Sequence, residues 1–280
     1  KLLYPVKTAF AVMYSLCGYV ILYGSCFTPW MDIVALFPLL MLALDRLLTT
    51  GKKLFYIFMV ALSFIINYYL SAMALIYVFL VSGVYILLLC ERKEWKKHAW
   101  NLGIGTAAGM GLSCFVLIPV FMQLSGSQRG NAGGSIVSQY LGWIKGAIVT
   151  DGSMAAFQRY MMLYGLSFVL AVILIGLKKY KEDKKMCRVM ACLLGIALLP
   201  MFVEGINLMW HFGSYNGYTL RNGFLIAFTL LCMGAYYAQK MFADMPLEKK
   251  YIKRQIVIAA VMCLVYAAGY LLIPQNNEIL

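Results

Sequence analysis

Long apolar stretches alternate with short charged segments along almost the whole chain. A transmembrane helix needs about 20 mainly apolar residues to cross a hydrocarbon core about 30 Å thick. By this criterion the pattern predicts nine spans, at about 8–26, 30–48, 54–69, 72–90, 102–124, 159–177, 189–205, 221–239 and 256–273. We therefore expect an all-α, polytopic transmembrane helical bundle that forms a single domain over residues 1–280.

Two local patterns refine this prediction. The apolar stretch from Leu54 to Cys90 would be about 55 Å long as one helix, which is too long for a single span. We expect a helical hairpin there, turning at Asn67–Ser71. Gly105 and Gly109 are four residues apart, a spacing typical of close contact between transmembrane helices, and ordinary packing is its simplest interpretation.

The basic residues predict the orientation of the bundle. Twenty of the 24 Lys and Arg residues fall in five segments, at about 1–7, 46–53, 92–97, 178–188 and 240–254. If these segments are cytoplasmic, only Arg129, Lys145, Arg159 and Arg221 remain outside, as the positive-inside rule requires. The prediction is an N-terminus inside, a C-terminus outside, and two longer outer loops at about 125–158 and 206–220.

Composition supports a membrane protein and narrows its partners. The chain is 63% hydrophobic and 12% charged, with a mean hydropathy of +0.80. Soluble domains are about 45–50% apolar and about 25% charged, so this surplus needs lipid as its solvent. A net charge of +13 would suggest nucleic acid in a soluble protein. Here the basic residues lie between spans, so we expect anionic lipids as partners and no nucleic acid.

The cysteines indicate no metal centre or disulfide framework. The eight cysteines form neither a CxxC pair nor a cluster with histidine, and most lie inside apolar runs. We therefore expect no cofactor, although a divalent ion between a phosphate and carboxylates would be compatible with the sequence.

Few acidic residues lie outside the predicted cytoplasmic segments. They are Asp32, Asp151, Glu204 and Glu278. An ionisable group at membrane depth is costly and is a functional candidate by default. Asp32 stands near a helix N-terminus, where it could cap the helix, bind substrate or transfer a proton. Glu204 ends the span at 189–205, and a helix C-terminus is unfavourable for a carboxylate, so we expect it to be paired or functional. Asp151 is expected to be solvated.

Cationic and aromatic candidates gather near the second outer loop. Arg221 begins the span at 221–239, where a guanidinium beside free helix N–H groups would bind an anion such as a lipid phosphate. A snorkelling arginine is the alternative. His211 is a candidate phosphate contact or acid–base group, and Arg129 is a third cationic candidate. Four aromatic residues could stack on sugar rings or form an interfacial belt: Trp210, Phe212, Tyr215 and Tyr218.

Several short motifs occur in the order seen in one family. They are Tyr14–Tyr19, Trp30-Met31-Asp32, Phe37–Leu40, Leu44–Leu48, Gly51-Lys52-Lys53, Asn67-Tyr68-Tyr69, Trp210-His211-Phe212 and Tyr218–Phe224. Together they resemble the YfhO family of bacterial membrane proteins over most of the chain.

The resemblance implies a C-type glycosyltransferase fold (GT-C) in a bacterial cytoplasmic membrane. Such enzymes move a sugar from a polyprenyl-phosphate donor to an envelope polymer, such as teichoic acid, outside the membrane. Arg221 matches the family arginine, whose expected role is phosphate contact, and Asp32 matches a family aspartate in position. In this superfamily the base usually lies in the first outer loop. The chain begins at Lys1 without Met, so we expect a fragment that lacks this upstream part.

The chemistry of sugar transfer fits these residue types. A carboxylate must deprotonate the acceptor hydroxyl, and cationic groups must stabilise the departing lipid phosphate. We expect Asp32 and Glu204 to serve as catalytic acids or bases and to converge with His211 and Arg221 at the outer headgroup level. Two alternatives stay open. A lipid or polyol transporter or flippase would need broken helices and facing polar groups, and a non-catalytic scaffold for envelope assembly would tolerate loss of Asp32 or Arg221.

Overall fold

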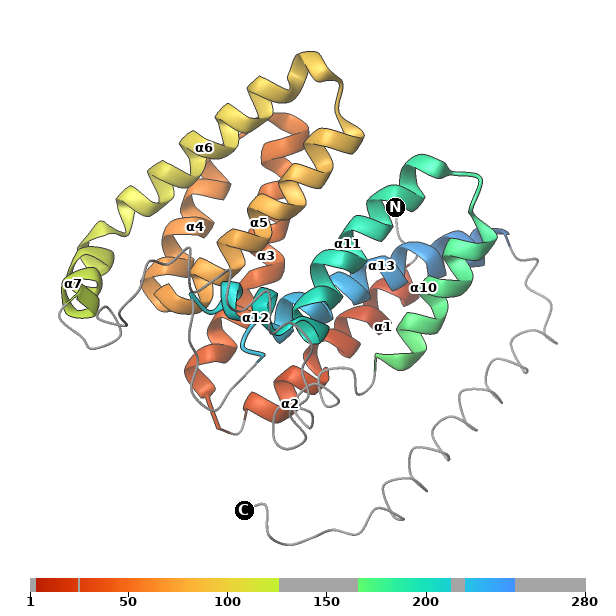
Figure 1. The fold of residues 1–280 in the computed structure, drawn as a ribbon, viewed down its shortest axis with the longest axis horizontal. Coiled ribbons are helices and arrows are strands. Elements are labelled where there is room, and N and C mark those ends of the chain that lie inside the picture. The colour runs from red at the N-terminus through yellow and green to blue at the C-terminus, as the bar shows by residue number, and fades with distance from the viewer. Residues whose placement is uncertain (1–3, 25, 126–165, 213–219, 245–280) are drawn as a thin grey trace, which may run out of the picture. The chain divides into compact units, whose positions relative to one another are not determined.

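The computed structural model describes residues 4–24, 26–125, 166–212 and 220–244, and these are helical almost throughout (Figure 1). The helices are α1 (Tyr4–Ser15), α2 (Gly18–Gly24), α3 (Thr28–Thr50), α4 (Leu54–Ile66), α5 (Tyr68–Leu89), the 3₁₀ turn η1 (Arg92–Glu94), α6 (Trp95–Leu112), α7 (Cys114–Ser125), α10 (Ser167–Lys179), α11 (Lys184–Phe202), α12 (Glu204–Trp210) and α13 (Gly223–Asp244). The chain divides into two compact units, Lys1–Ala238 and Gln239–Leu280, and the features below belong to the first.

The all-α membrane fold is confirmed, whereas the number of nine spans is not. Among the described residues, four helices are long and apolar enough to cross a membrane: Pro5–Gly24, Thr28–Thr50, Tyr68–Leu89 and Gly223–Asp244. A bent pair, Arg92–Leu112 with Cys114–Gln123, makes a fifth if it counts as one span. The span predicted at 256–273 lies outside the described residues.

The predicted hairpin is confirmed, and Asn67 makes its turn. α4 ends at Ile66, and α5 begins one residue later at Tyr68. Asn67 is extended, and its side-chain oxygen accepts a hydrogen bond from the Leu70 N–H at 3.1 Å. This bond satisfies one of the free N–H groups at the start of α5, so a single polar residue both ends one helix and caps the next.

The span predicted at 102–124 is sharply bent, which corrects the expectation of one continuous crossing. α6 and α7 meet at Ser113 with an angle of 76° between them. The Ser113 hydroxyl donates to the Met110 carbonyl oxygen at 2.9 Å. A serine that bonds its own helix competes with the helical backbone pattern and favours a bend. Hydropathy does not register this change, because both sides of the bend are apolar.

The second outer segment is also corrected, since its first part is helical. The chain leaves α11 at Phe202, passes through the extended residue Val203, and begins α12 at Glu204. Pro200 lies in the last turn of α11 and withholds one backbone N–H from that helix. Glu204 therefore starts a helix instead of ending one. The electrostatic argument that made its carboxylate unfavourable does not apply, because the N-terminal end of a helix favours negative charge.

Helix α6 packs closely on α4 through the two glycines noted in the sequence. A Cβ at Gly105 would lie 2.9 Å from a ring carbon of Tyr56, and one at Gly109 would lie 2.7 Å from the Cβ of Val60. Next to them, the hydroxyls of Tyr56 and Thr106 form a buried hydrogen bond of 2.9 Å. The spacing thus serves helix packing, as its simplest interpretation held.

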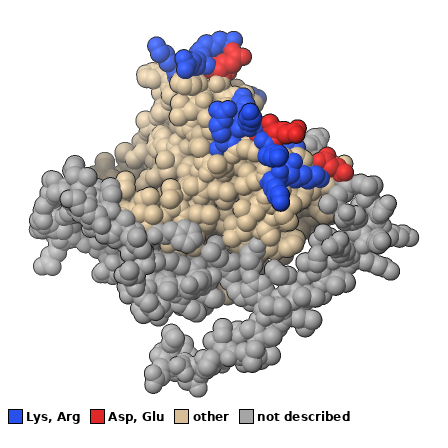
Figure 2. Space-filling model, turned by 45° about the vertical axis from the view of Figure 1, so that its right-hand side comes forward, with Lys and Arg blue, Asp and Glu red and all other residues tan. Residues whose placement is uncertain are grey.

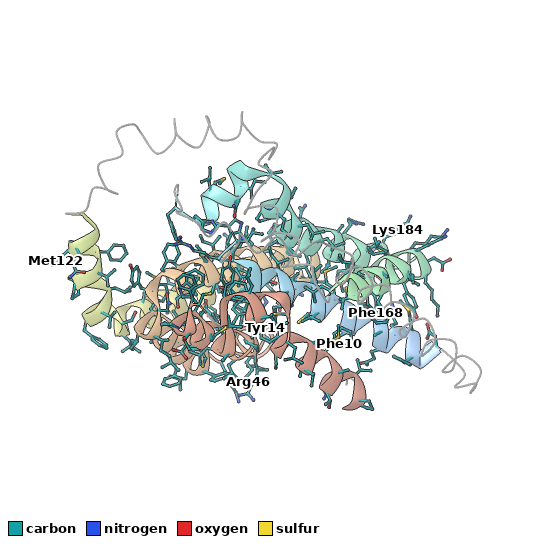
Figure 3. The ribbon with its side chains drawn as sticks, turned by 90° about the horizontal axis from the view of Figure 1, so that it is seen from below. Phe10, Tyr14, Arg46, Met122, Phe168 and Lys184 are labelled. Atoms are coloured by element: carbon teal, nitrogen blue, oxygen red, sulfur yellow. The ribbon has the colours of Figure 1, made fainter. Side chains whose placement is uncertain are left out.

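Helix α1 packs against α13 and α3 through aromatic side chains, and Phe10 and Tyr14 lie along it in Figure 3. Tyr14 meets the ring of Phe228 edge-on at 5.8 Å and donates a hydrogen bond to the Val34 carbonyl oxygen at 2.9 Å. Phe10 lies over Gly234, where an added Cβ would be 3.0 Å from its ring. The bundle therefore closes around α13, in which most residues from Phe224 to Tyr237 are buried.

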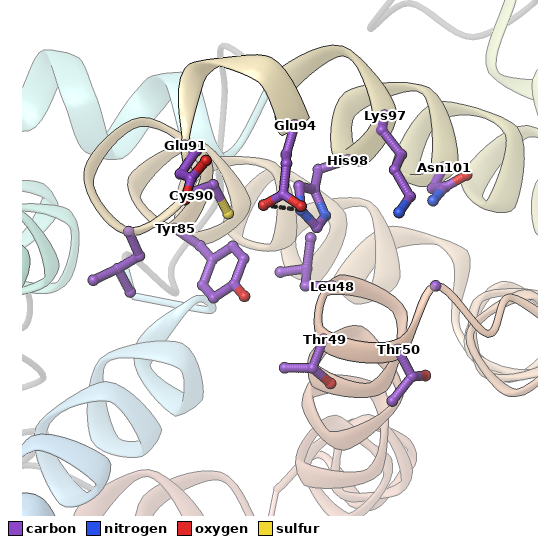
Figure 4. Close-up of a pocket in the computed structure, with 12 residues that line it drawn as sticks. Leu48, Thr49, Thr50, Tyr85, Cys90, Glu91, Glu94, Lys97, His98 and Asn101 are labelled. Atoms are coloured by element: carbon purple, nitrogen blue, oxygen red, sulfur yellow. Dashed lines mark ion pairs between the residues drawn. The ribbon is translucent and has the colours of Figure 1, made fainter.

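The turns at one end of the bundle carry the basic residues. The Lys185 ammonium at the start of α11 donates to the Leu89 carbonyl oxygen at the end of α5, 3.4 Å away. A polar pocket of 340 Å³ joins the end of α3, with Thr50, to Lys97 and His98 on α6 (Figure 4). In this pocket Glu94 lies 3.9 Å from the His98 ring nitrogen. Figure 2 shows the Lys and Arg side chains gathered over these turns, with acidic side chains among them.

The α4–α6 contact predicts opposite effects for two glycines of one helix. Gly109→Ala should destabilise the protein by about 1–3 kcal/mol, because its methyl group would strike Val60 and the Ile57 carbonyl oxygen, 2.9 Å away. Gly111→Ala meets no atom within 4 Å and should be neutral or stabilising by up to about 1 kcal/mol. Thermal unfolding in detergent measures both. Equal melting temperatures for the two variants would contradict this packing.

Candidate functional site

The guanidinium of Arg221 lies against two aromatic rings at the end of the bundle opposite the basic turns. Its Cζ is 5.7 Å from the ring centre of Trp30 and 5.3 Å from that of Tyr69. Both distances fall within the range of cation–π attraction. We call Arg221, Trp30 and Tyr69 the arginine cage. The rings stabilise the charge of the guanidinium.

Three helix starts meet at this cage. Trp30 lies in the first turn of α3, Tyr69 in the first turn of α5, and Arg221 two residues before α13. The N-terminal end of a helix carries a partial positive charge and free N–H groups. The partial positive charges of the three helix starts therefore add to the charge of the guanidinium. The arrangement favours binding of an anion over binding of a cation.

The backbone at Arg221 is held by α2. The hydroxyl of Tyr19 donates to the Arg221 carbonyl oxygen at 3.1 Å, across 202 residues of sequence. Tyr19 is fully buried, and its ring contacts those of Tyr23 at 4.7 Å and Phe224 at 5.6 Å. One buried side chain thus fixes the start of α13 against the N-terminal helices.

Trp30 is positioned by two further aromatic rings. Phe27 stacks on it with a centroid distance of 4.4 Å and an angle of 17°, and Tyr23 lies 5.3 Å away. Since Phe27 immediately precedes α3 and Tyr23 belongs to α2, the connection between these helices fixes the indole. Packing against Phe27 and Tyr23 therefore determines which face of the Trp30 indole lies toward Arg221.

His211 follows α12 and is electrostatically coupled to the cage. It is 2% exposed, and its Nδ1 lies 2.8 Å from the Asn207 carbonyl oxygen. Because a carbonyl can only accept, Nδ1 carries the proton and Nε2 keeps its lone pair. Burial lowers the pKa of His211 to about 4; the hydrogen bond to Asn207 opposes this shift, and the charge of Arg221 adds to it. The imidazole is therefore neutral at pH 7.

Phe212 connects this histidine to the cage and has an unusual backbone. Its φ is +54°, the left-handed region that side chains other than glycine rarely adopt. Its ring meets that of Tyr69 edge-on at 6.2 Å. A strained residue beside charged and aromatic groups is typical of a functional segment.

Two buried asparagines, Asn207 and Asn222, have side-chain polar atoms that lack hydrogen-bond partners within the described part of the chain. The amide nitrogen and oxygen of Asn207 are completely buried, and neither has a hydrogen-bond partner within the described part of the chain. The side-chain oxygen of Asn222, next to Arg221, is in the same condition. Leaving such a group unsatisfied costs about 1–3 kcal/mol, so each of these side chains favours an added polar partner.

The structure brings together some of the predicted site residues and separates others. The charge of Arg221 acts on His211. Trp210 is buried and lines an apolar groove between α5 and α11, outside the cage. Glu204 begins α12. Arg129, Tyr215 and Tyr218 lie outside the described residues.

Asp32 lies on the exposed side of α3. It is two residues beyond Trp30, which turns it by about 200° from the ring that faces Arg221. Within the described residues it makes no ion pair. The capping interpretation is wrong, because Phe27 occupies the N-cap and Asp32 is the fifth residue of the helix. Its role in proton transfer stays a prediction.

Sequence reasoning did not assign Trp30, Tyr69 or Asn207 to the site. Trp30 and Tyr69 were noted only within motifs. They precede Arg221 by 191 and 152 residues, and contacts at such separations leave no local signal in the sequence. Among the described residues, no group of three or more His, Cys, Asp or Glu could hold a metal ion.

A comparison with family models decides the identity of the chain. The model of the bacterial membrane protein YfhO matches residues 3–280. The chain belongs to the YfhO family. No curated protein and no solved structure matches it. In this YfhO-family chain the match extends across α2, α3, α5 and α13, the helices that build the arginine cage.

The buried histidine predicts a pH dependence of stability. Its folded pKa of about 4 is below the ordinary value of 6.5, so the unfolded state binds the proton first as pH falls. Stability from this source should be complete above about pH 6.5 and decline toward pH 4. Thermal unfolding across this range measures it. His211→Gln should lack this component, whereas His98→Gln should retain it; identical profiles for wild type and His211→Gln would contradict the assignment.

Proposed function

We propose that this protein is a membrane glycosyltransferase that moves a sugar from a polyprenyl-phosphate donor to a cell-envelope acceptor, such as a teichoic-acid-like polymer, outside the cytoplasm. The observation that carries the proposal is the arginine cage at the end of the bundle opposite the basic turns. Membership of a family associated with membrane glycosyltransferase-like function supports the reaction class.

The positive-inside rule gives the proposed orientation. The turns after α3, α5 and α10 carry most of the described basic residues, and basic turns favour the cytoplasmic side. The arginine cage then lies at the outer leaflet of the bacterial cytoplasmic membrane, with the N-terminus of the chain inside and the C-terminus outside. A lipid-anchored phosphate is confined to this level.

Arg221 would bind the phosphate of the donor and stabilise it as it leaves. A guanidinium donates two parallel hydrogen bonds to phosphate oxygens, and a phosphate gains charge when its bond to the sugar breaks. Preorganised donors of this kind contribute most where charge develops. Trp30 and Tyr69 hold the guanidinium in place beforehand, so little reorganisation is needed during transfer.

A base must remove the proton of the acceptor hydroxyl as the new bond to the sugar forms. The unprotonated Nε2 of His211 is a base electrostatically coupled to Arg221. Asp32 and Glu204 are the carboxylates proposed for this step from the sequence. Asp32 would need the acceptor to approach from the exposed side of α3, because its side chain lies away from the cage.

A lipid flippase or transporter is the second candidate function. Two helix breaks support this second function. One lies at Ser113 between α6 and α7, and the other lies at Val203 between α11 and α12. Discontinuous helices are a common feature of transporter binding sites. A flippase would move lipid-linked sugar between leaflets without consuming it, so a product assay separates the two functions. A non-catalytic scaffold would show neither activity and would tolerate loss of Arg221.

Sugar transfer by the full-length protein in proteoliposomes tests this proposal. Arg221→Ala should lower kcat by about 10²–10³-fold, as expected for loss of a donor to a developing anion. Arg221→Lys should recover part of the loss, because it keeps the charge without the two-pronged geometry. The matched control is Arg46→Ala, which removes a guanidinium 5.5 Å from the Phe55 ring at the basic end and should leave transfer unchanged.

Two outcomes would count against the proposal. Equal activity of Arg221→Ala and wild type would remove the arginine cage from the reaction. Absence of transfer by wild type with each of several polyprenyl-phosphate sugars would reject the proposal that the protein is a glycosyltransferase. Asp32→Asn, measured in the same assay, decides whether that carboxylate is the base.

A further inference from the structure

The polar pocket of 340 Å³ at the basic end of the bundle lies between three helix ends (Figure 4). The end of α3 forms one wall, the end of α5 with the turn after it forms another, and the first two turns of α6 form the third. Ligand sites in proteins are concave and hold a small number of polar groups in fixed positions. The walls of this pocket carry charges of both signs, which distinguishes it from the arginine cage.

The α3 wall presents hydrogen-bond acceptors. The hydroxyls of Thr49 and Thr50 donate to carbonyl oxygens one turn earlier in α3, both at 2.7 Å, so their oxygens can only accept further hydrogen bonds. The Gly51 N–H bonds the Leu47 carbonyl oxygen. Among the described residues, no donor reaches the carbonyl oxygens of Thr49 and Thr50. The last carbonyls of a helix carry a partial negative charge, so this wall favours a positively charged donor.

The end of α5 differs, because its last carbonyl oxygens are already bonded. The Lys185 ammonium donates to that of Leu89 at 3.4 Å. The Trp95 indole N–H donates to that of Cys90, also at 3.4 Å. Of the two helix C-terminal ends that line the pocket, the end of α3 is therefore the one that still attracts a cation.

Glu94 adds a carboxylate to this acceptor surface. Its side chain is 45% exposed and lies 3.9 Å from the Nε2 of His98, whose ring meets that of Tyr85 edge-on at 6.1 Å. In Figure 4, Glu94 and His98 reach the pocket from one side, and the end of α3 lies on the other. A primary ammonium has three N–H donors and no acceptor, so it suits a space between a carboxylate and helix carbonyls.

Lys97 supplies a positive charge from α6. Within the described part of the chain it forms no ion pair, whereas Glu91 is paired with Lys93 at 2.6 Å. Asn101 is four residues further along α6 and therefore lies on the same face of the helix, as Figure 4 shows. An ammonium beside an amide that can donate hydrogen bonds suits an anionic group such as phosphate or carboxylate.

We propose that this pocket binds a small zwitterion, with a primary ammonium between Glu94 and the end of α3 and a phosphate or carboxylate at Lys97 and Asn101. Phosphoethanolamine has this combination of charges. It occurs as the headgroup of a membrane phospholipid and as a soluble molecule. The inference goes beyond the proposed function and does not depend on it, because the pocket shares no residue with the arginine cage.

Binding of soluble phosphoethanolamine to the purified full-length protein in nanodiscs tests the pocket. The comparison probes are ethanolamine, which carries only the ammonium, and methyl phosphate, which carries only the anion. Each should bind weaker by about tenfold or more, because each lacks one charge-assisted contact. Saturating phosphoethanolamine should also raise the melting temperature, since a ligand that binds only the folded state stabilises it.

Two variants separate the two charges of the ligand. Lys97→Gln should weaken phosphoethanolamine binding by about tenfold or more and leave ethanolamine binding unchanged. Glu94→Gln should weaken the binding of both and leave methyl phosphate binding unchanged. The matched control is Lys96→Gln, which removes the neighbouring charge of α6 from outside the pocket lining and should bind phosphoethanolamine like wild type. Asn101→Leu is a second test of the anionic half if Lys97→Gln does not fold.

The lipid composition of the nanodisc distinguishes the two sources of the ligand. If the phospholipid headgroup occupies the pocket, phosphatidylethanolamine in the disc should compete with the soluble probe. Binding of phosphoethanolamine would then be weaker than in discs of phosphatidylglycerol alone. Equal binding in the two discs would identify a soluble zwitterion as the ligand.

Three results would overturn the inference. The first is absence of saturable phosphoethanolamine binding in discs of phosphatidylglycerol alone. The second is binding of ethanolamine or methyl phosphate as tight as that of phosphoethanolamine. The third is equal phosphoethanolamine binding by wild type and by folded Lys97→Gln and Glu94→Gln, with melting temperatures of the free proteins as the measure of folding.

Discussion

The attraction between the Arg221 guanidinium and the rings of Trp30 and Tyr69 links three helix starts that are far apart in the sequence. A charged side chain at the edge of the hydrocarbon region is costly unless it is stabilised there. The rings supply stabilisation, while Tyr19 fixes the arginine backbone from a fourth helix. The packing of α2, α3, α5 and α13 therefore determines where the Arg221 charge lies. The position of this charge in turn defines the candidate site.

The bundle is electrostatically different at its two ends. Lysines and arginines crowd the turns after α3, α5 and α10, where exposed acidic residues partly offset them, as in the pair formed by Lys93 and Glu91. At the other end the Arg221 guanidinium lies against the rings of Trp30 and Tyr69, and the buried His211 is neutral. The first arrangement suits a surface of anionic headgroups. The second suits one anionic group held in a defined orientation.

Features that depend on local sequence could be predicted, and those that depend on distant contacts could not. Hydropathy and length located most of the described helices, and the polar residues around Asn67 located the hairpin turn. The Gly105–Gly109 spacing predicted a close helix contact, but only the structure identifies α4 as the partner. The bend at Ser113 and the new helix at Glu204 left no mark in hydropathy, because apolar residues continue through both breaks. Arg221 was predicted from its place before a helix, but Trp30 and Tyr69 face it only in the folded bundle.

Asp32 shows that residue type and position along a span are insufficient to assign a residue to the site. Sequence placed Asp32 and Trp30 at the same end of one span, and both lie near the start of α3, yet their helical phases differ by about 200°. One therefore faces Arg221 while the other faces outward. Which side of a helix faces the site depends on the neighbouring helices, and a single chain sequence does not contain that information directly.

The central claim is that a lipid phosphate binds at Arg221. Solid-state NMR can measure the dipolar coupling between ¹³C-labelled arginine Cζ and the ³¹P of polyprenyl phosphate in proteoliposomes, with Arg221→Lys identifying the Arg221 signal. The account predicts a coupling that corresponds to direct contact at Arg221 and disappears in that variant. A coupling that persists unchanged in Arg221→Lys, carried by arginines of the basic turns, would contradict it.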